Sequence, residues 1–105
     1  MSELALEPAG EGQFRLRGDL DFVSVPPLLN AGATLFGSSA NNVVVDLSGV
    51  RRTTSVGLAL MLEWKKHARR VNKTVEYRNV PPQMKAMATV SGLDDILLRA
   101  PTAPA

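Results

Sequence analysis

Alternating and consecutive apolar residues predict four strands in this chain. Residues 13–17 alternate polar and apolar positions with a period of two, which is typical of a half-buried strand. The short apolar piece at residues 4–6 ends in a turn cluster at residues 8–12, so it could pair with residues 13–17 as a hairpin. Three consecutive valines at 43–45 predict a strand covered on both faces, and residues 74–78 alternate again as a strand.

Helical spacing predicts a first helix after the second strand and a third helix near the end of the chain. The first helix is supported by apolar or small residues at helical intervals, with two prolines in its first turn: Val25, Leu28, Leu29, Gly32 and Leu35, with Pro26 and Pro27. Pro81 and Pro82 can open the third helix, and residues 94–98 can form a last short turn. The expected inner side of the third helix comprises Met84, Met87, Ala88 and Leu93.

The second helix is predicted from about Val56 to Val71, and its N-terminal end is apolar almost all round. The basic run at residues 65–70 suits the negative end of the helix dipole, and Asn72 is a plausible cap after it. The predicted apolar stripe has a main row and a widened start: Val56, Ala59, Leu60, Trp64, His67 and Val71, with Leu58, Met61 and Leu62.

The order of these elements predicts one α/β domain. Two strand–helix–strand units normally form right-handed crossovers to parallel neighbours, and the N-terminal hairpin adds an antiparallel strand. We therefore expect a mixed, mostly parallel sheet with about three to four helices on one or both of its faces. The chain of 105 residues fits a single domain over residues 1–99, followed by a disordered Pro/Ala tail over residues 100–105.

The connection between the valine strand and the second helix contains the main candidate chemistry. Gly18–Asp21 and Asp46–Gly49 have turn compositions, and Ser55 lies where an N-cap is expected, directly before the apolar helical run. A hydroxyl there faces unpaired N–H groups and the positive end of the helix dipole. It could serve as a cap, a phosphate acceptor or a docking point for another protein. Arg51 and Arg52 just before it are either solvated charges or a basic rim that meets acidic residues of a partner.

Composition excludes several function classes. The chain has no cysteine, and one histidine cannot form a multi-histidine metal site. Ser55 and His67 would lie about 18 Å apart along one helix, too far for a nucleophile and its base. Neither phosphate-binding glycine motif is present, and the net charge of +2 gives no strong attraction to nucleic acid. No apolar run reaches the about 18 residues of a membrane span, and no signal peptide is evident, so we expect a cytoplasmic protein.

The segments "VVVDLSGV" and "SVGLALML" resemble the signature of STAS domains, the fold shared by anti-sigma-factor antagonists and the tails of sulfate transporters. "RGDLDFVSVPPLL" (residues 17–29) resembles the strand-to-helix segment of the same fold. "LEWKKHARRVNKTVEYRNVPPQMKAMATVSGLDDIL" (residues 62–97) is similar to the MlaB branch in particular, the STAS subunit of the Mla ABC transporter that moves phospholipids between bacterial membranes. The resemblance extends from about Phe14 to Leu97.

The resemblance implies a non-catalytic STAS domain without a cofactor at the cytoplasmic face of the inner membrane. Its expected partners are the ATPase subunit (MlaF-like) of the transporter and, indirectly, the permease (MlaE-like), which together maintain the lipid asymmetry of the outer membrane. ATP would be bound by the partner. The residues expected to bind the partner form the start of the second helix and its preceding loop: Arg51, Arg52, Thr53, Thr54, Ser55, Val56 and Leu58.

The resemblance also implies an alternative, an anti-sigma-factor antagonist regulated by phosphorylation of Ser55. The position that matches Ser55 is a phosphorylated serine in those antagonists and a threonine at the ATPase interface in MlaB-like subunits. This chain has Thr54 where an aspartate is typical, and Val56 where glycine or serine is usual. Partner docking tolerates these two changes better than recognition by a kinase does.

Overall fold

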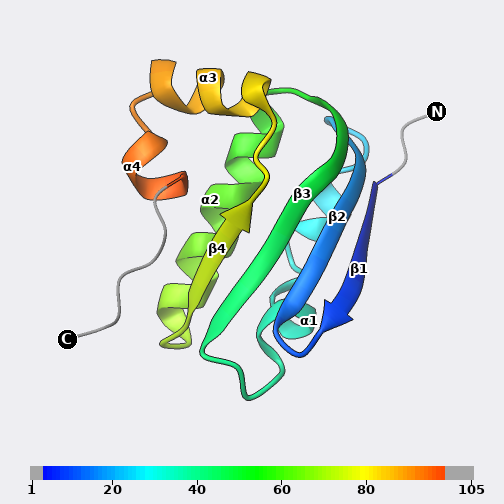
Figure 1. Ribbon diagram of the computed structural model, residues 1–105, viewed down its shortest axis with the longest axis vertical. Coiled ribbons are helices and arrows are strands. Elements are labelled where there is room, and N and C mark those ends of the chain that lie inside the picture. Colours follow the sequence, from blue (N-terminus) through cyan, green and yellow to red (C-terminus); the bar gives the residue numbers. More distant parts are fainter. Residues whose placement is uncertain (1–3, 99–105) are drawn as a thin grey trace.

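A four-stranded mixed sheet forms one layer of the molecule (Figure 1). The computed structural model describes residues 4–98. The strands lie in the order β1 (Leu4–Gly10), β2 (Gln13–Leu20), β3 (Asn42–Thr53) and β4 (Thr74–Arg78). β1 and β2 form an antiparallel hairpin, whereas the β2–β3 and β3–β4 pairs are parallel. The predicted α/β fold with a mixed, mostly parallel sheet is confirmed.

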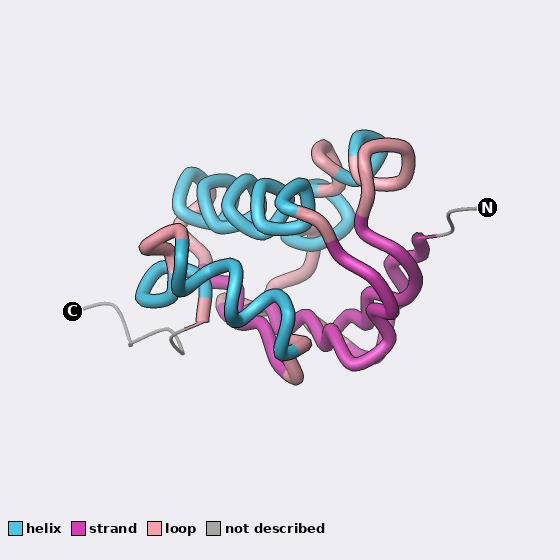
Figure 2. Tube along the Cα trace, turned by 90° about the horizontal axis from the view of Figure 1, so that it is seen from above, coloured by secondary structure: helices cyan, strands magenta, loops and turns pink. Residues whose placement is uncertain are grey.

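α2 runs along the strands and covers one face of this sheet as a second layer (Figure 2). In chain order the helices are a 3₁₀ turn η1 (Pro26–Leu28), then α1 (Gly32–Phe36), α2 (Ser55–Arg70), α3 (Pro82–Val90) and α4 (Asp94–Leu97). The covered face of the sheet supplies Phe14, Leu16, Val43, Val45, Leu47, Val75 and Tyr77 to the core. α3 and α4 pack against α2. Within residues 4–98, no helix is long and apolar enough to cross a membrane.

The valine strand is covered on one face only, so the prediction of a doubly covered strand is wrong. Val43 and Val45 are fully buried under the helices, whereas Val44 points to the other face and is only half-buried. On that other face β2 presents exposed polar side chains such as Arg15 and Arg17. The sheet therefore has an apolar side and a polar side, as the period-two pattern of β2 indicated.

β3 continues through its expected turn at residues 46–49, and β2 continues through all but the last residue of the expected turn at residues 18–21. β2 reaches Leu20, and β3 runs through residues 46–49 to Thr53. The parallel ladder pairs Gly18 with Val50 and Leu20 with Thr53. The register shifts between Arg15 and Arg17 and between Gly18 and Asp19, so the turn-type residues are accommodated as β-bulges within the strands. The longer strands bring the ends of β2 and β3 to the same edge of the sheet, next to the start of α2.

The predicted first helix is broken into η1 and α1. The N–H groups of Leu28 and Leu29 donate to residues three positions earlier and form the 3₁₀ turn, and α1 begins only at Gly32, where the Leu35 N–H donates to the Ala31 carbonyl oxygen. At Gly32 an added Cβ would lie 2.0 Å from Cε1 of His67, whose ring stacks on Phe36 with 5.3 Å between ring centroids. His67 is therefore a partly buried packing residue, in agreement with its place in the predicted stripe of the second helix.

The buried side of α2 differs from the predicted apolar stripe by a rotation about the helix axis. Its buried residues are Gly57, Leu58, Leu60, Met61, Trp64 and Ala68. Ala59 and Val71, which were expected in the stripe, are exposed. The remaining sides of α2 pack on β4, α1, α3 and α4. Asn72 follows the C-cap residue Val71 and adopts the left-handed conformation (φ 59°), as its predicted capping role requires.

The C-terminal part of the fold follows the prediction. Met84 and Ala88 are buried in α3, Met87 and Leu93 pack against the core, and α4 forms the last short helix. The predicted tail at residues 100–105 lies outside the described residues.

Candidate functional site

Thr54, not Ser55, caps α2. The Thr54 hydroxyl accepts a hydrogen bond from the N–H of Val56 (3.3 Å), and the extended backbone of Thr54 (φ −124°, ψ −178°) places it just outside the helix. Ser55 is consequently the first helical residue, and its side chain is exposed. Within residues 4–98 the Ser55 hydroxyl forms no hydrogen bond, so it is available to a partner or to a modifying enzyme.

The first turn of α2 packs closely against the C-terminal ends of β2 and β3. A Cβ added to Gly57 would lie 2.5 Å from Oγ1 of Thr53 and 3.0 Å from Cδ1 of Leu20. The Thr54 N–H and hydroxyl both donate to the carbonyl oxygen of Leu20. These contacts fix the position of Ser55 relative to the sheet.

The structure divides the predicted partner-binding residues into two groups. Thr53 and Leu58 are buried, with 8% and 6% of their surface exposed, and both face the core. Arg51, Arg52, Thr54 and Ser55 are exposed and Val56 is half-buried. Five of the residues can therefore contribute to a surface, which we call the α2-start surface: Arg51, Arg52, Thr54, Ser55 and Val56.

Of the two arginines of the α2-start surface, Arg51 is in an ion pair within the described residues and Arg52 is not. Nε of Arg51 lies 3.6 Å from Oδ1 of Asp19, whose side chain is only 15% exposed. Arg52 is exposed, and within residues 4–98 it forms no ion pair. Arg52 is thus the cation that remains open to a partner.

A neighbouring loop at residues 21–24 lies at the same end of the sheet (Figure 1) and was not predicted from the sequence as part of the site. It carries Phe22 and Val23, which are 76% and 77% exposed. The signal in the sequence is that both residues fall outside the alternation of β2 and precede the helical spacing that begins at Val25.

A shallow depression of 770 Å³ lies between this loop and the α2-start surface. Its lining combines both signs of charge with polar groups and includes Asp19, Asp21, Arg51, Arg52, Thr54 and Gln83. Within residues 4–98 no group of three or more His, Asp or Glu side chains could hold a metal ion. The arrangement suits recognition of another protein by hydrogen bonds and charge.

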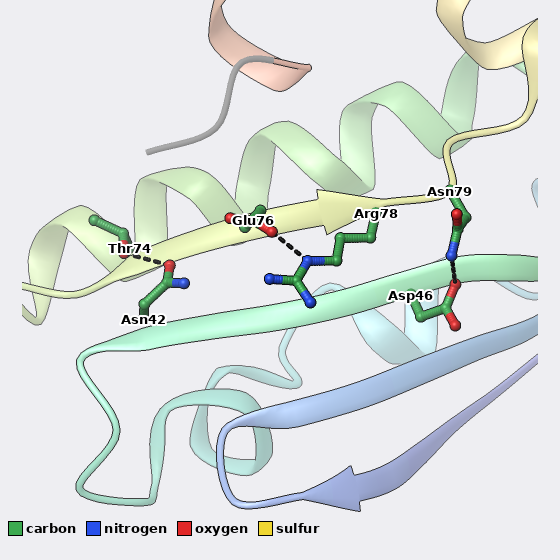
Figure 3. A network of polar contacts seen from close by, with 6 residues as sticks. All are labelled: Asn42, Asp46, Thr74, Glu76, Arg78 and Asn79. Atoms are coloured by element: carbon green, nitrogen blue, oxygen red, sulfur yellow. Dashed lines mark hydrogen bonds and ion pairs between the residues drawn. The ribbon is translucent and has the colours of Figure 1, made fainter. Parts of the chain in front are cut away.

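The polar face of the sheet holds a second set of polar contacts (Figure 3). Thr74 donates to Asn42 (2.7 Å), Arg78 pairs with Glu76, and the Asn79 amide donates to Asp46 (3.0 Å). The Ser48 backbone N–H and the Asn79 amide stabilise the ionised Asp46 carboxylate and lower its pKa. These groups satisfy one another, so this face is less suited to binding than the α2-start surface.

Comparisons with known proteins agree with the fold. The family model described as "Mlab, STAS domain" matches residues 6–99. No curated protein sequence matches the chain. Among solved structures, the chain is similar to the anti-sigma factor antagonist SpoIIAA in its unphosphorylated form, with a TM-score of 0.70 and 19% identity over 95% of this chain and 89% of that one.

Two further structures are similar. The Bacillus cell fate determinant SpoIIAA in its phosphorylated form has a TM-score of 0.66 and 20% identity over 95% of this chain and 92% of that one. An anti-sigma factor antagonist from Mycobacterium paratuberculosis has a TM-score of 0.63 and 25% identity over 97% of this chain and 87% of that one.

Proposed function

This chain belongs to the MlaB-type STAS domain family, and on that premise we propose that it is a non-catalytic subunit that binds and regulates the ATPase of an Mla-type ABC transporter. STAS domains are generally regulatory protein-interaction modules without enzymatic activity. In this proposal the chain acts at the cytoplasmic face of the inner membrane, next to an MlaF-like ATPase that contacts an MlaE-like permease. The transporter moves phospholipids and so maintains the lipid asymmetry of the outer membrane.

The observation that carries the proposal is the exposed hydroxyl of Ser55 at the start of α2, which forms no hydrogen bond within the described part of the chain. Since Thr54 already caps the helix, the fold does not need the Ser55 hydroxyl for capping. The hydrogen bonds from Thr54 to Leu20 hold the α2-start surface in one geometry, and a preorganised surface loses little conformational entropy on binding.

Regulation follows from binding alone. A subunit that binds only the native or the assembled ATPase stabilises that state, by a free energy that grows with the logarithm of its concentration divided by its Kd. The chain needs no nucleotide site for this role, because the partner binds the ATP.

The second candidate function is that of an anti-sigma-factor antagonist switched by phosphorylation of Ser55. The exposed Ser55 hydroxyl and the likeness to SpoIIAA in both phosphorylation states favour it. Thr54 and Val56, where an aspartate and a small residue are typical of such antagonists, favour docking. A phosphate on Ser55 would lie at the positive end of the α2 dipole, which tolerates the charge, so geometry alone does not separate the two functions.

The test is to purify the tagged protein from its own organism together with the MlaF-like ATPase. We expect a stoichiometric complex and an intact mass without a phosphate adduct. Failure of the ATPase to bind, combined with a phosphorylated fraction at Ser55, would overturn the proposal in favour of the antagonist.

A further inference from the structure

Phe22 and Val23 form an exposed apolar pair, here called the Phe22–Val23 knob. Single exposed apolar residues are common on protein surfaces and need no explanation. Here two consecutive large apolar side chains are more than three-quarters exposed, at 76% and 77%. They lie in the loop between β2 and η1, at the sheet edge where α2 begins (Figures 1 and 2).

The loop that carries the knob is held by its own hydrogen bonds. Oδ1 of Asp21 accepts from the N–H groups of Val23 and Ser24, both at 2.9 Å. The Ser24 hydroxyl donates to the carbonyl oxygen of Asp19 (2.5 Å) and accepts from the Asp21 N–H (3.1 Å). These bonds fix the backbone on both sides of Phe22, so the exposed ring projects from a rigid support.

Hydrogen bonds and shared depressions connect the loop of the knob to the α2-start surface. Leu20, two residues before Phe22, accepts both hydrogen bonds from Thr54. Asp21 lines the 770 Å³ depression beside Arg52, while Val23 and Ser24 line a second depression of 840 Å³. Arg51 lines both depressions. The loop is thus a ridge between two hollows, with arginine side chains next to it.

We propose that the Phe22–Val23 knob inserts into an apolar pocket of the ATPase whose rim carries carboxylates facing Arg52; this inference rests on the proposed function. Aromatic side chains that fill desolvated pockets dominate the affinity of many interfaces, and a preorganised loop loses little entropy on binding. Arg52 forms no ion pair within the described residues, so its guanidinium group can form a bidentate pair with a carboxylate of the partner. Because Asp19 already pairs with Arg51, Arg52 is the residue of this depression that favours a carboxylate on the ATPase.

The experiment measures the affinity of the purified MlaF-like ATPase for the full chain and its variants. We expect Phe22→Ser to raise Kd at least about tenfold, the equivalent of about 1.4 kcal/mol. The matched control is Val90→Ser, because Val90 is 88% exposed on α3, and its Kd should change by less than about twofold. Arg52→Glu should raise Kd at least about tenfold by placing like charges together. Circular-dichroism melting curves should coincide for the three variants and the wild type.

The outcomes separate this inference from the proposed function. If wild-type chain does not bind the ATPase, both fail. If Ser55→Arg abolishes binding but Phe22→Ser binds like the wild type, the proposed function stands and the knob inference is overturned. A parallel assay uses phosphatidylglycerol vesicles, because an apolar loop beside arginines could instead insert into an anionic membrane. Loss of vesicle binding by Phe22→Ser with unchanged ATPase affinity would also overturn the inference.

Discussion

Thr54 donates two hydrogen bonds to Leu20: its N–H and its hydroxyl both donate to the Leu20 carbonyl oxygen, at 3.1 and 3.2 Å. The same hydroxyl accepts the N–H of Val56. One side chain therefore caps α2 and ties the helix start to the end of β2. Ser55, one residue further on, takes no part in these contacts within the described residues.

This arrangement predicts that Thr54 matters more than Ser55 for stability. Thr54→Ala should lower the free energy of unfolding by about 1 kcal/mol, within the usual range of about 0.5–2 kcal/mol for a lost cap. Ser55→Ala should change it by less than about 0.5 kcal/mol, as for most exposed positions. Urea unfolding of both variants measures the difference. A loss at Ser55→Ala as large as that at Thr54→Ala would show that the capping residue is Ser55 after all.

The tight contact at Gly57 gives the second prediction. Alanine normally favours a helix over glycine by about 1 kcal/mol, but here its Cβ would approach Oγ1 of Thr53 to 2.5 Å. We expect Gly57→Ala to destabilise the domain by about 1–3 kcal/mol, the usual cost of overpacking.

A double-mutant cycle with Thr53→Ala separates this clash from other effects of the substitution. Removing the Thr53 hydroxyl relieves the closest contact, so the double variant should lose less stability than the sum of the two single variants. Strictly additive losses would mean that the contact between Thr53 and Gly57 is not the cause.

Much of the fold could be predicted from the sequence because the relevant signals are local. The alternation in β2 and β4, the two prolines at the start of α3 and the position of Asn72 after α2 each reflect backbone geometry over a few residues. These signals were sufficient to predict the order of the elements. From that order, the rule that strand–helix–strand crossovers are right-handed and join parallel strands predicts the mixed sheet.

The remaining features depend on distant contacts. The turn composition of residues 46–49 is overridden by the parallel ladder with β2, which pairs Arg17 with Gly49. The burial of Leu58 and the exposure of Ala59 depend on the rotation of α2 about its axis, which neighbouring helices determine. Exposure of Phe22 arises only once Asp21 and Ser24 have fixed the loop. Part of the candidate site was therefore predicted, and its apolar component was not.

Asp46 gives a prediction on pH. Hydrogen bonds from the Ser48 N–H and the Asn79 amide stabilise its carboxylate and lower the folded pKa. The ionised group therefore adds stability above the unfolded value of about 3.9, and this contribution is lost as pH falls through the folded pKa. Asp46→Asn should lose less stability than the wild type between pH 7 and pH 3 in urea unfolding. An equal loss in both proteins would contradict a stabilising role for the charge.

Substitutions at Ser55 test docking directly. The Ser55→Thr variant keeps the hydroxyl and should retain the ATPase, and Ser55→Ala should weaken binding only modestly. Ser55→Arg should abolish co-purification, because it places a long cation at the positive end of the helix dipole and adds bulk to the α2-start surface. The isolated Ser55→Arg domain should still fold, since the position is exposed.

Co-purification with the MlaF-like ATPase measures the effect on the complex, and a melting curve of each isolated variant excludes unfolding as the cause. Intact mass of the cell-derived wild type reports phosphorylation independently. The mass is needed because Ser55→Ala and Ser55→Arg remove a phosphate acceptor as well as a docking group, whereas Ser55→Thr retains both. Docking through Ser55 therefore requires three results together: binding by Ser55→Thr, loss by a folded Ser55→Arg, and no phosphate on the wild type. If the Ser55→Arg protein retains the ATPase, this part of the α2-start surface does not contact it.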